Sequence, residues 1–106
     1  MAKMSPTQLS LRKLRNDGYK TIQVVEHWVH FSKTRRDLYN CIDILAIKDG
    51  EVLAVQTTTW GNRLARCKKI ADNEHIAEMR KANWTVHVHG WRKEEGRWVL
   101  TTEDVS

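Results

Sequence analysis

The stretch CIDILAIKDGEVLAVQTT (residues 41–58) contains two apolar, β-branched runs joined by a polar Lys-Asp-Gly segment. Asp-Gly between such runs is typical of a β-hairpin with a two-residue turn. With Asp49 and Gly50 as the turn, Lys48 faces Glu51, and the register is set for the whole hairpin. This register predicts that the only acid of the first strand lies opposite the only amide of the second.

The two polar residues are Asp43 and Gln56, whose Cβ atoms we expect at about 4.5–5.5 Å from one another. Side chains alternate along a strand with period two, so Thr58 shares their face. An acid beside an amide in otherwise apolar strands indicates a small functional site. The opposite face is predicted to be core and consists of Ile42, Ile44, Ala46, Leu53 and Val55.

Length and composition favour one ordinary globular domain spanning residues 1–106, with 41% hydrophobic and 29% charged residues. No apolar run approaches the ~20 residues of a membrane span. The N-terminal Met-Ala-Lys-Met-Ser-Pro has no apolar core of a signal peptide. Cys41 and Cys67 are too few for a disulfide framework. We therefore expect a cytoplasmic protein that does not bind a membrane.

Basic residues outnumber acidic ones by 18 to 13, which gives a net charge of +5 with histidine neutral. Clustered basic residues are typical of surfaces that bind a polyanion, although a solvated surface is the alternative. No pattern indicates that bases are recognised in a sequence-specific way. The clusters are Lys33, Arg35 and Arg36; Arg63, Arg66, Lys68 and Lys69; and Arg92, Lys93 and Arg97.

Outside the hairpin, local signals predict a mixed α/β order. Ser5, Pro6 and Gln8 form the N-terminal capping pattern of a helix that ends at Gly18. The other predicted elements are a strand over 21–30, a basic loop over 31–40, a helix from Asn62 that continues after Asn73, strands over 84–90 and 97–101, and a loose tail from Thr102.

This order of elements, with the hairpin text Ile-Asp-Ile-Leu-Ala-Ile and Val-Leu-Ala-Val-Gln-Thr-Thr, resembles the PD-(D/E)XK nuclease superfamily over roughly residues 7–100. Within it, the pattern is similar to archaeal-type Holliday-junction resolvases and small virus-type nucleases with the VRR-NUC fold. The resemblance implies a restriction-endonuclease-like αβββαβ core, a small mixed sheet flanked by helices. It also implies a Mg²⁺- or Mn²⁺-dependent DNA endonuclease that is selective for DNA structure, such as branched DNA.

In that family an Asp on the first hairpin strand is followed by Glu-x-Lys on the second. Asp43 matches the Asp, whereas Gln56 stands in place of Glu and Thr58 in place of Lys. The resemblance implies that Asp43, the Gln56 amide oxygen and the Thr57 carbonyl bind the metal. Gln in place of Glu removes a negative charge, which weakens metal binding. Thr58 cannot supply the positive charge that stabilises the transition state.

The following helix offers a replacement cation, because Arg66 and Lys69 are three residues apart and share a face. The catalytic candidates are thus Asp43, Gln56, Thr58 and Lys69. The family's N-terminal acidic residue has three candidates, Gln8, Asp17 and Glu26. Candidate DNA contacts are Lys33, Arg35, Arg36, Trp60, Arg63, Arg66 and Lys68, of which Trp60 would stack on an unpaired base or else cover the hairpin.

Three alternatives stay open at this point. One is a catalytically inactive nucleic-acid-binding module on the same fold, and another is a small interaction protein with an incidental basic surface. A zinc site using His87 and His89, or His27 and His30, with the two cysteines is less favoured, because no tight Cys/His pair is present. A homodimer is implied only by the resemblance, and both a cellular and a phage origin fit the short chain.

Overall fold

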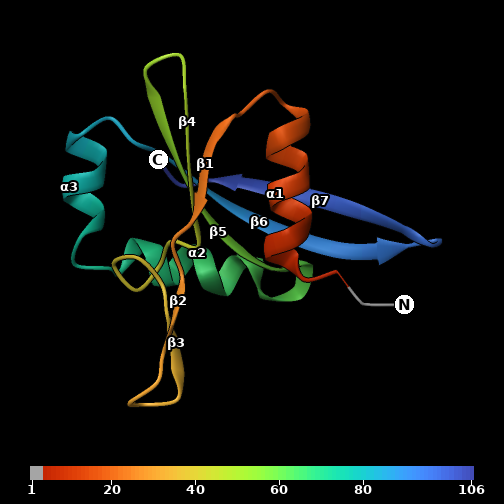
Figure 1. Cartoon of the computed structure of the whole chain (residues 1–106), viewed down its shortest axis with the longest axis horizontal. Coiled ribbons are helices and arrows are strands. Elements are labelled where there is room, and N and C mark those ends of the chain that lie inside the picture. Colours follow the sequence, from red (N-terminus) through yellow and green to blue (C-terminus); the bar gives the residue numbers. More distant parts are fainter. Residues whose placement is uncertain (1–3) are drawn as a thin grey trace.

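The computed structural model describes residues 4–106 as a five-stranded mixed sheet with helices on both faces and a two-stranded ribbon (Figure 1). Residues 1–3, part of the segment that argues against a signal peptide, lie outside the described residues. The elements are α1 (Pro6–Asn16), β1 (Thr21–Val24), β2 (His27–Val29), β3 (Thr34–Arg36), β4 (Ile44–Lys48), β5 (Glu51–Thr59), the 3₁₀ helix η1 (Trp60–Asn62), α2 (Arg63–Ala71), α3 (Ile76–Lys81), β6 (Thr85–Glu94) and β7 (Arg97–Asp104).

The strands of the sheet are ordered β1-β4-β5-β6-β7, and every neighbouring pair is antiparallel except β5 and β6. Asp49 (φ 54°) and Gly50 (φ 77°) both have positive φ, as the tight turn of a two-residue hairpin requires. Lys48 faces Glu51, which confirms the predicted register. Helices α2 and α3 connect β5 to β6, and such a long crossover is what allows these two strands to run parallel.

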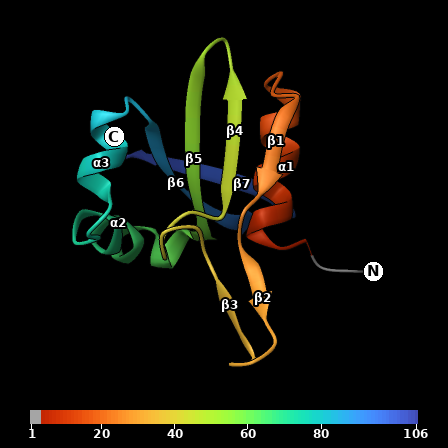
Figure 2. The same cartoon turned by 60° about the vertical axis from the view of Figure 1, so that its left-hand side comes forward.

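The two faces of the sheet have separate cores, with α1 on one side and α2 and α3 on the other (Figure 2). The α1 side contains Leu14 with Ile44, Ala46, Leu53 and Val55. Ile42 was expected with these residues, but it packs instead with Ala54 and Ile70 on the opposite side. The reason is that Ile42 and Asp43 precede β4, so the alternation of side chains along the strand does not extend to them.

Helix α1 begins as predicted, with the reciprocal capping bonds of Ser5 and Gln8, and Gly18 (φ 97°) follows its end. The continuous strand predicted over 21–30 is wrong, because β1 ends at Val24 and β2 begins at His27. The loop predicted over 31–40 contains β3, which pairs with β2. Both views show this β2–β3 ribbon projecting away from the sheet (Figures 1 and 2). The sequence did not predict the pairing of β2 with β3, because this pairing depends on both segments together and not on either one by itself.

The C-terminal hairpin is longer than predicted. β6 extends to Glu94 and β7 to Asp104, so the tail from Thr102 is not loose. Glu95 (φ 49°) and Gly96 (φ 79°) form a second tight turn, which keeps the two strands in register along their length. Beyond β7, the Val105 N–H still donates to Val86 O (2.9 Å). No helix within residues 4–106 has the length and apolar character needed to cross a membrane.

Candidate functional site

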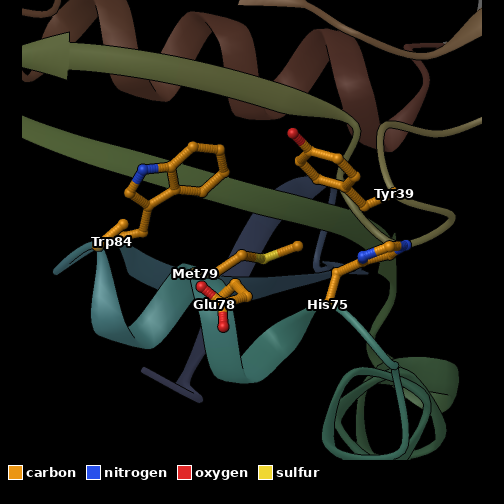
Figure 3. Close-up of a pocket in the computed structure, with 6 residues that line it drawn as sticks. Tyr39, His75, Glu78, Met79 and Trp84 are labelled. Atoms are coloured by element: carbon orange, nitrogen blue, oxygen red, sulfur yellow. The ribbon is translucent and has the colours of Figure 1, made fainter.

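The segment between β3 and β4 contributes to two cavities of different chemistry. The first, called here the aromatic cavity, has a volume of about 330 Å³ and is lined by Tyr39, His75, Glu78, Met79, Ala82 and Trp84 (Figure 3). The second, called the acidic cavity, has a volume of about 230 Å³. It is lined by Ser5, Pro6, Thr7, Glu26, Arg35, Asp37, Asp43, Gln56, Thr57 and Arg66.

Three carboxylates meet in the acidic cavity because of strand register. β1 pairs with β4, and the Val25 N–H donates to Asp43 O (2.8 Å), so Glu26 leaves the sheet beside Asp43. His27 pairs with Arg36 at the base of the ribbon, so the next residues towards the sheet, Glu26 and Asp37, also lie across from each other. One carboxyl oxygen from each of Glu26, Asp37 and Asp43 lies within 4.8 Å of the others. Residues distant in sequence thus form one cluster.

Asp43 is the buried member of the cluster, with 3% of its surface exposed. Its Oδ2 accepts three hydrogen bonds, from Gln56 Nε2 (2.7 Å), Thr57 N (2.8 Å) and Thr57 Oγ1 (3.1 Å). Burial raises the pKa of Asp43 to about 7, and the carboxylates of Asp37 and Glu26 act in the same direction, while the Thr57 N–H opposes them. A cation that binds to Asp43 near neutral pH would therefore have to displace the proton of the carboxylic acid.

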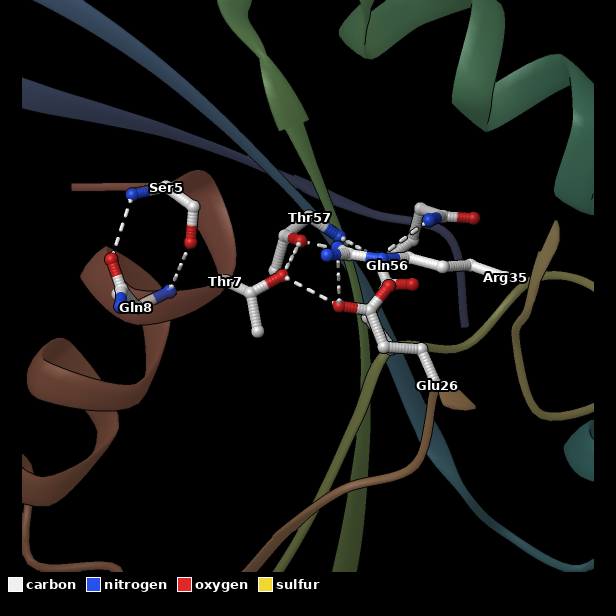
Figure 4. Close-up of polar contacts among 8 residues, drawn as sticks. Ser5, Thr7, Gln8, Glu26, Arg35, Gln56 and Thr57 are labelled. Atoms are coloured by element: carbon white, nitrogen blue, oxygen red, sulfur yellow. Dashed lines mark hydrogen bonds and ion pairs between the residues drawn. The ribbon is translucent and has the colours of Figure 1, made fainter. Parts of the chain in front are cut away.

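Gln56 and Thr57 complete the floor of the cavity. Gln56 is 3% exposed, and its Oε1 has no hydrogen-bond partner within residues 4–106. A buried oxygen without a partner has lost its hydration and is a strong acceptor for a ligand. The Thr57 hydroxyl also contacts the Thr7 hydroxyl (2.9 Å), and Thr7 Oγ1 donates to Glu26 Oε1 (3.5 Å), which links α1 to the cluster (Figure 4).

Positive side chains stand at the rim of the acidic cavity. Arg35 Nη1 lies 3.8 Å from Glu26 Oε1, and Lys69 Nζ lies 4.0 Å from Asp37 Oδ2. Arg66 lines the cavity itself. The structure thus brings both predicted cations of α2, Arg66 and Lys69, to the carboxylates. Because the donors are mostly carboxylate and amide oxygens, the set suits a hard divalent cation rather than zinc, which favours nitrogen and sulfur.

The other predicted site residues lie elsewhere. Thr58 is buried and is not among the residues that line the acidic cavity. Trp60 contacts the guanidinium groups of Arg63 and Arg92, at 4.3 and 5.0 Å from its ring centroid. Gly90 makes room for this stack, since a Cβ there would lie 2.9 Å from Arg63 Cβ. The remaining predicted DNA contacts, Lys33, Arg36 and Lys68, are exposed outside the cavity.

Sequence reasoning left the N-terminal acid open and missed Asp37. Of the three candidates, only Glu26 reaches the cluster, because Gln8 caps Ser5 and Asp17 pairs with Lys13 (2.9 Å). Asp37 was hidden in the segment predicted as a basic loop. β2 and β3 contain one β-branched residue each, Val29 and Thr34, so no strong local signal marks the ribbon that brings Asp37 to the cluster.

The residues considered for zinc have other contacts. His89 is 3% exposed, and its Nδ1 lies 2.8 Å from Ser10 Oγ, which also accepts from Trp91 Nε1 (2.9 Å). Burial, with smaller effects of His87 and Lys13, lowers the pKa of His89 to about 4. Burial also raises the pKa of the Cys41 thiol to about 11, which keeps it protonated and unreactive.

Comparison of the chain with protein-family models, with curated proteins and with solved structures finds no match in any of the three.

Proposed function

We propose that this protein is a metal-dependent DNA endonuclease and that the acidic cavity is its active site. The observation that carries the proposal is the cluster of Glu26, Asp37 and Asp43, whose carboxyl oxygens lie within 4.8 Å of one another in an open cavity. Three acids at this spacing repel one another unless a proton or a cation neutralises them. The unpartnered Gln56 Oε1 beside them adds a fourth oxygen donor.

The order of elements supports the restriction-endonuclease-like core that the resemblance implies. A helix and a strand precede the β4–β5 hairpin, and a helical crossover leads to β6, parallel to β5. The hydrogen bond between Gln56 and Asp43 on this hairpin fits the resemblance, in which these two residues match the family's Asp and Glu. The site departs from the family in its cation, because Thr58 replaces Lys and the cations at the cavity come from α2 instead.

Each residue has a role in this proposal. Glu26, Asp37, Asp43 and Gln56 Oε1 would hold Mg²⁺ or Mn²⁺, and the Thr57 carbonyl stays a predicted further ligand. When bound, such an ion neutralises phosphate charge and lowers the pKa of a bound water. The two hydrogen bonds from Thr57 hold the Asp43 carboxylate in one orientation. Arg66 and Lys69 would balance the charge that develops on the scissile phosphate.

DNA is the proposed substrate because the cavity opens among cations on a chain with a net charge of +5. Phosphate contacts hold a nucleic acid without reading its sequence. We therefore propose selectivity for branched or single-stranded DNA, and a symmetric homodimer for a branched substrate.

Cleavage of plasmid and branched DNA with Mg²⁺ or Mn²⁺ tests the proposal. Asp43→Asn should reduce cleavage by on the order of 100-fold or more, because a metal ligand is lost. Asp49→Asn is the matched control, since Asp49 is an exposed turn residue in a conformation that Asn adopts readily. Equal cleavage by native protein and the Asp43 variant would exclude this cavity as the active site.

A second comparison tests the replacement cation. Lys69→Ala and Arg66→Ala should each lower the rate of cleavage by about 10-fold or more, while metal affinity stays within about 3-fold. Lys20→Ala, an exposed lysine ahead of β1, is the control for the loss of one positive charge. If all three variants lose activity equally, the effect is one of overall charge on DNA binding, and neither α2 cation acts in catalysis.

The alternative is a catalytically inactive nucleic-acid-binding module on the same fold. The pKa of Asp43, about 7, favours it, because a carboxylic acid that retains its proton near neutrality binds metal weakly. In that case no metal supports cleavage, and both native protein and Asp43→Asn bind DNA with the same steep dependence on salt. DNA binding that is absent, or insensitive to salt, would point instead to an interaction protein with an incidental basic surface.

A further inference from the structure

The aromatic cavity is a second built site that the proposed nuclease activity does not use. The ring centroids of Tyr39 and His75 are 5.1 Å apart with planes at 44°, and those of Tyr39 and Trp84 are 6.4 Å apart at 46°. Met79, 4% exposed, lies between these walls as the floor (Figure 3). The rings are tilted relative to one another, so together they do not form a single flat face for a planar molecule.

The backbone of two of the wall residues is held in place by hydrogen bonds from one side chain. Asn73 Nδ2 donates to Tyr39 O (2.8 Å), and Asn73 Oδ1 accepts from His75 N (2.7 Å). At the other end of α3, Trp84 N donates to Met79 O (3.0 Å). Tyr39 has a φ of 52°, which is unusual for a bulky residue. The backbone from which the three rings extend is therefore fixed on both sides of the cavity.

Glu78 is the one carboxylate among the residues that line the aromatic cavity. Residues 72–78 contain Asp72, Glu74 and Glu78 and no lysine or arginine, and this acidic segment is flanked by Lys68, Lys69, Arg80 and Lys81. Glu78 lines the cavity and pairs with Lys81 at 3.5 Å, but both side chains are at least three-quarters exposed. Such a surface pair is weak and exchanges readily for another cation.

We propose that the aromatic cavity binds a substituted ammonium group. The faces of Trp, Tyr and His attract a cation through their π electrons, and quaternary ammonium groups are recognised by aromatic cages of this kind. Met79 supplies a polarisable floor for the methyl groups, and Glu78 supplies the opposite charge. Two sources share this chemistry, a free quaternary amine and a methylated lysine side chain of another protein. The site is independent of the proposed nuclease function.

Titration of the full chain with choline, followed by NMR of the tryptophan indole signals, tests the proposal. The control ligand is 3,3-dimethylbutan-1-ol, which has the same shape without the charge. We expect choline to bind at least about 5-fold more tightly than the neutral alcohol, and Glu78→Gln to remove much of that difference. A peptide containing trimethyllysine is the third ligand. Tighter binding of the peptide would assign the group to a protein partner, and tighter binding of choline to a small molecule.

The variants keep the proposal falsifiable. Tyr39→Ala should weaken choline binding by about 10-fold, and its CD spectrum and unfolding curve show whether it folds. Glu95→Gln, in the β6–β7 turn at the far end of the molecule from α3, is the matched control and should change nothing (Figure 1). Equal binding of the neutral alcohol would overturn the proposal in favour of an apolar pocket. Tighter binding of adenosine monophosphate, or no binding of either ammonium ligand, would also overturn it.

Discussion

The acidic and aromatic cavities are neighbours on one loop, since Asp37 lines the first and Tyr39 the second, yet they are built in different ways. The acidic cavity is lined by residues from α1, β3, β5 and α2 and from the segments that flank β1, β3 and β4, and it brings like charges together. The aromatic cavity is assembled largely from α3 and its flanking residues.

The two cavities differ in how their side chains affect the stability of the ligand-free fold. In the acidic cavity, burial and neighbouring carboxylates raise the pKa of Asp43 to about 7, so the ligand-free fold is destabilised where its carboxylate must be charged. In the aromatic cavity the walls pack against one another, and their contacts stabilise the fold with or without a ligand. We therefore expect binding and stability to oppose each other in the first cavity and to be nearly independent in the second.

The largest effect is expected for Asp43→Asn, which should change stability and cleavage in opposite directions. Without divalent metal at about pH 8, Asp43→Asn should raise the free energy of unfolding by on the order of 2 kcal/mol, because an amide removes the buried charge. The same variant should lose metal-dependent cleavage. Urea unfolding of native protein, Asp43→Asn and Asp49→Asn, with and without Mg²⁺, measures both. A destabilised Asp43→Asn would contradict the view that charge repulsion is stored in the cavity.

The pH dependence of stability should also differ between native protein and Asp43→Asn. The pKa of His89 is lowered from 6.5 to about 4, so His89 gains a proton on unfolding in this range, and stability falls as pH drops through it. The pKa of Asp43 is raised from 3.8 to about 7, so its contribution has the opposite sign and is lost as pH rises.

The two groups should therefore offset each other in the native protein. Its stability should vary little between about pH 4 and 6.5, whereas Asp43→Asn should lose on the order of 2 kcal/mol over the same range as pH falls. Urea midpoints measured across this range compare the two proteins. Parallel curves would mean that Asp43 is already ionised in the folded state.

Asn73→Ala should affect the two cavities unequally. The substitution removes the hydrogen bonds of the Asn73 side chain with Tyr39 O and His75 N. This should lower the free energy of unfolding by about 1 kcal/mol and weaken choline binding by about 5-fold. Metal affinity should change by less than about 2-fold, because Asp37 is positioned by the ribbon register. Calorimetric titrations with choline and with Mg²⁺ measure the two affinities. A parallel loss of metal affinity would show that the shared loop couples the cavities.

The smallest stability effect is expected for Tyr39→Gly. Glycine adopts the positive φ of this position without strain, which offsets the lost contacts of the ring. We expect the free energy of unfolding to stay within about 0.5 kcal/mol of the native value while choline binding weakens by about 10-fold. Thermal unfolding and titration of the same sample measure both quantities. A large destabilisation would assign Tyr39 a structural role and weaken the contrast between the cavities.

Much of the fold was predictable because its signals are local. The Asp49-Gly50 turn sets the hairpin register, and the Ser5 and Gln8 capping bonds begin α1 where predicted. The contact between Asp43 and Gln56 follows from that register alone. The lengths of β6 and β7 were underestimated, since pairing between two strands extends them beyond what either segment favours by itself.

The sequence by itself determined the hairpin, the first helix and the pairing of an acid with an amide, because turns, caps and strand alternation act between residues close in the chain or linked by a short turn. Only the tertiary structure decided that Glu26 and Asp37 join Asp43, since this requires β1 to pair with β4 and the ribbon to fold back on itself. It also decided that Asn73 holds Tyr39 from 34 residues away. Such contacts depend on which apolar faces are buried together, and no local pattern records that choice.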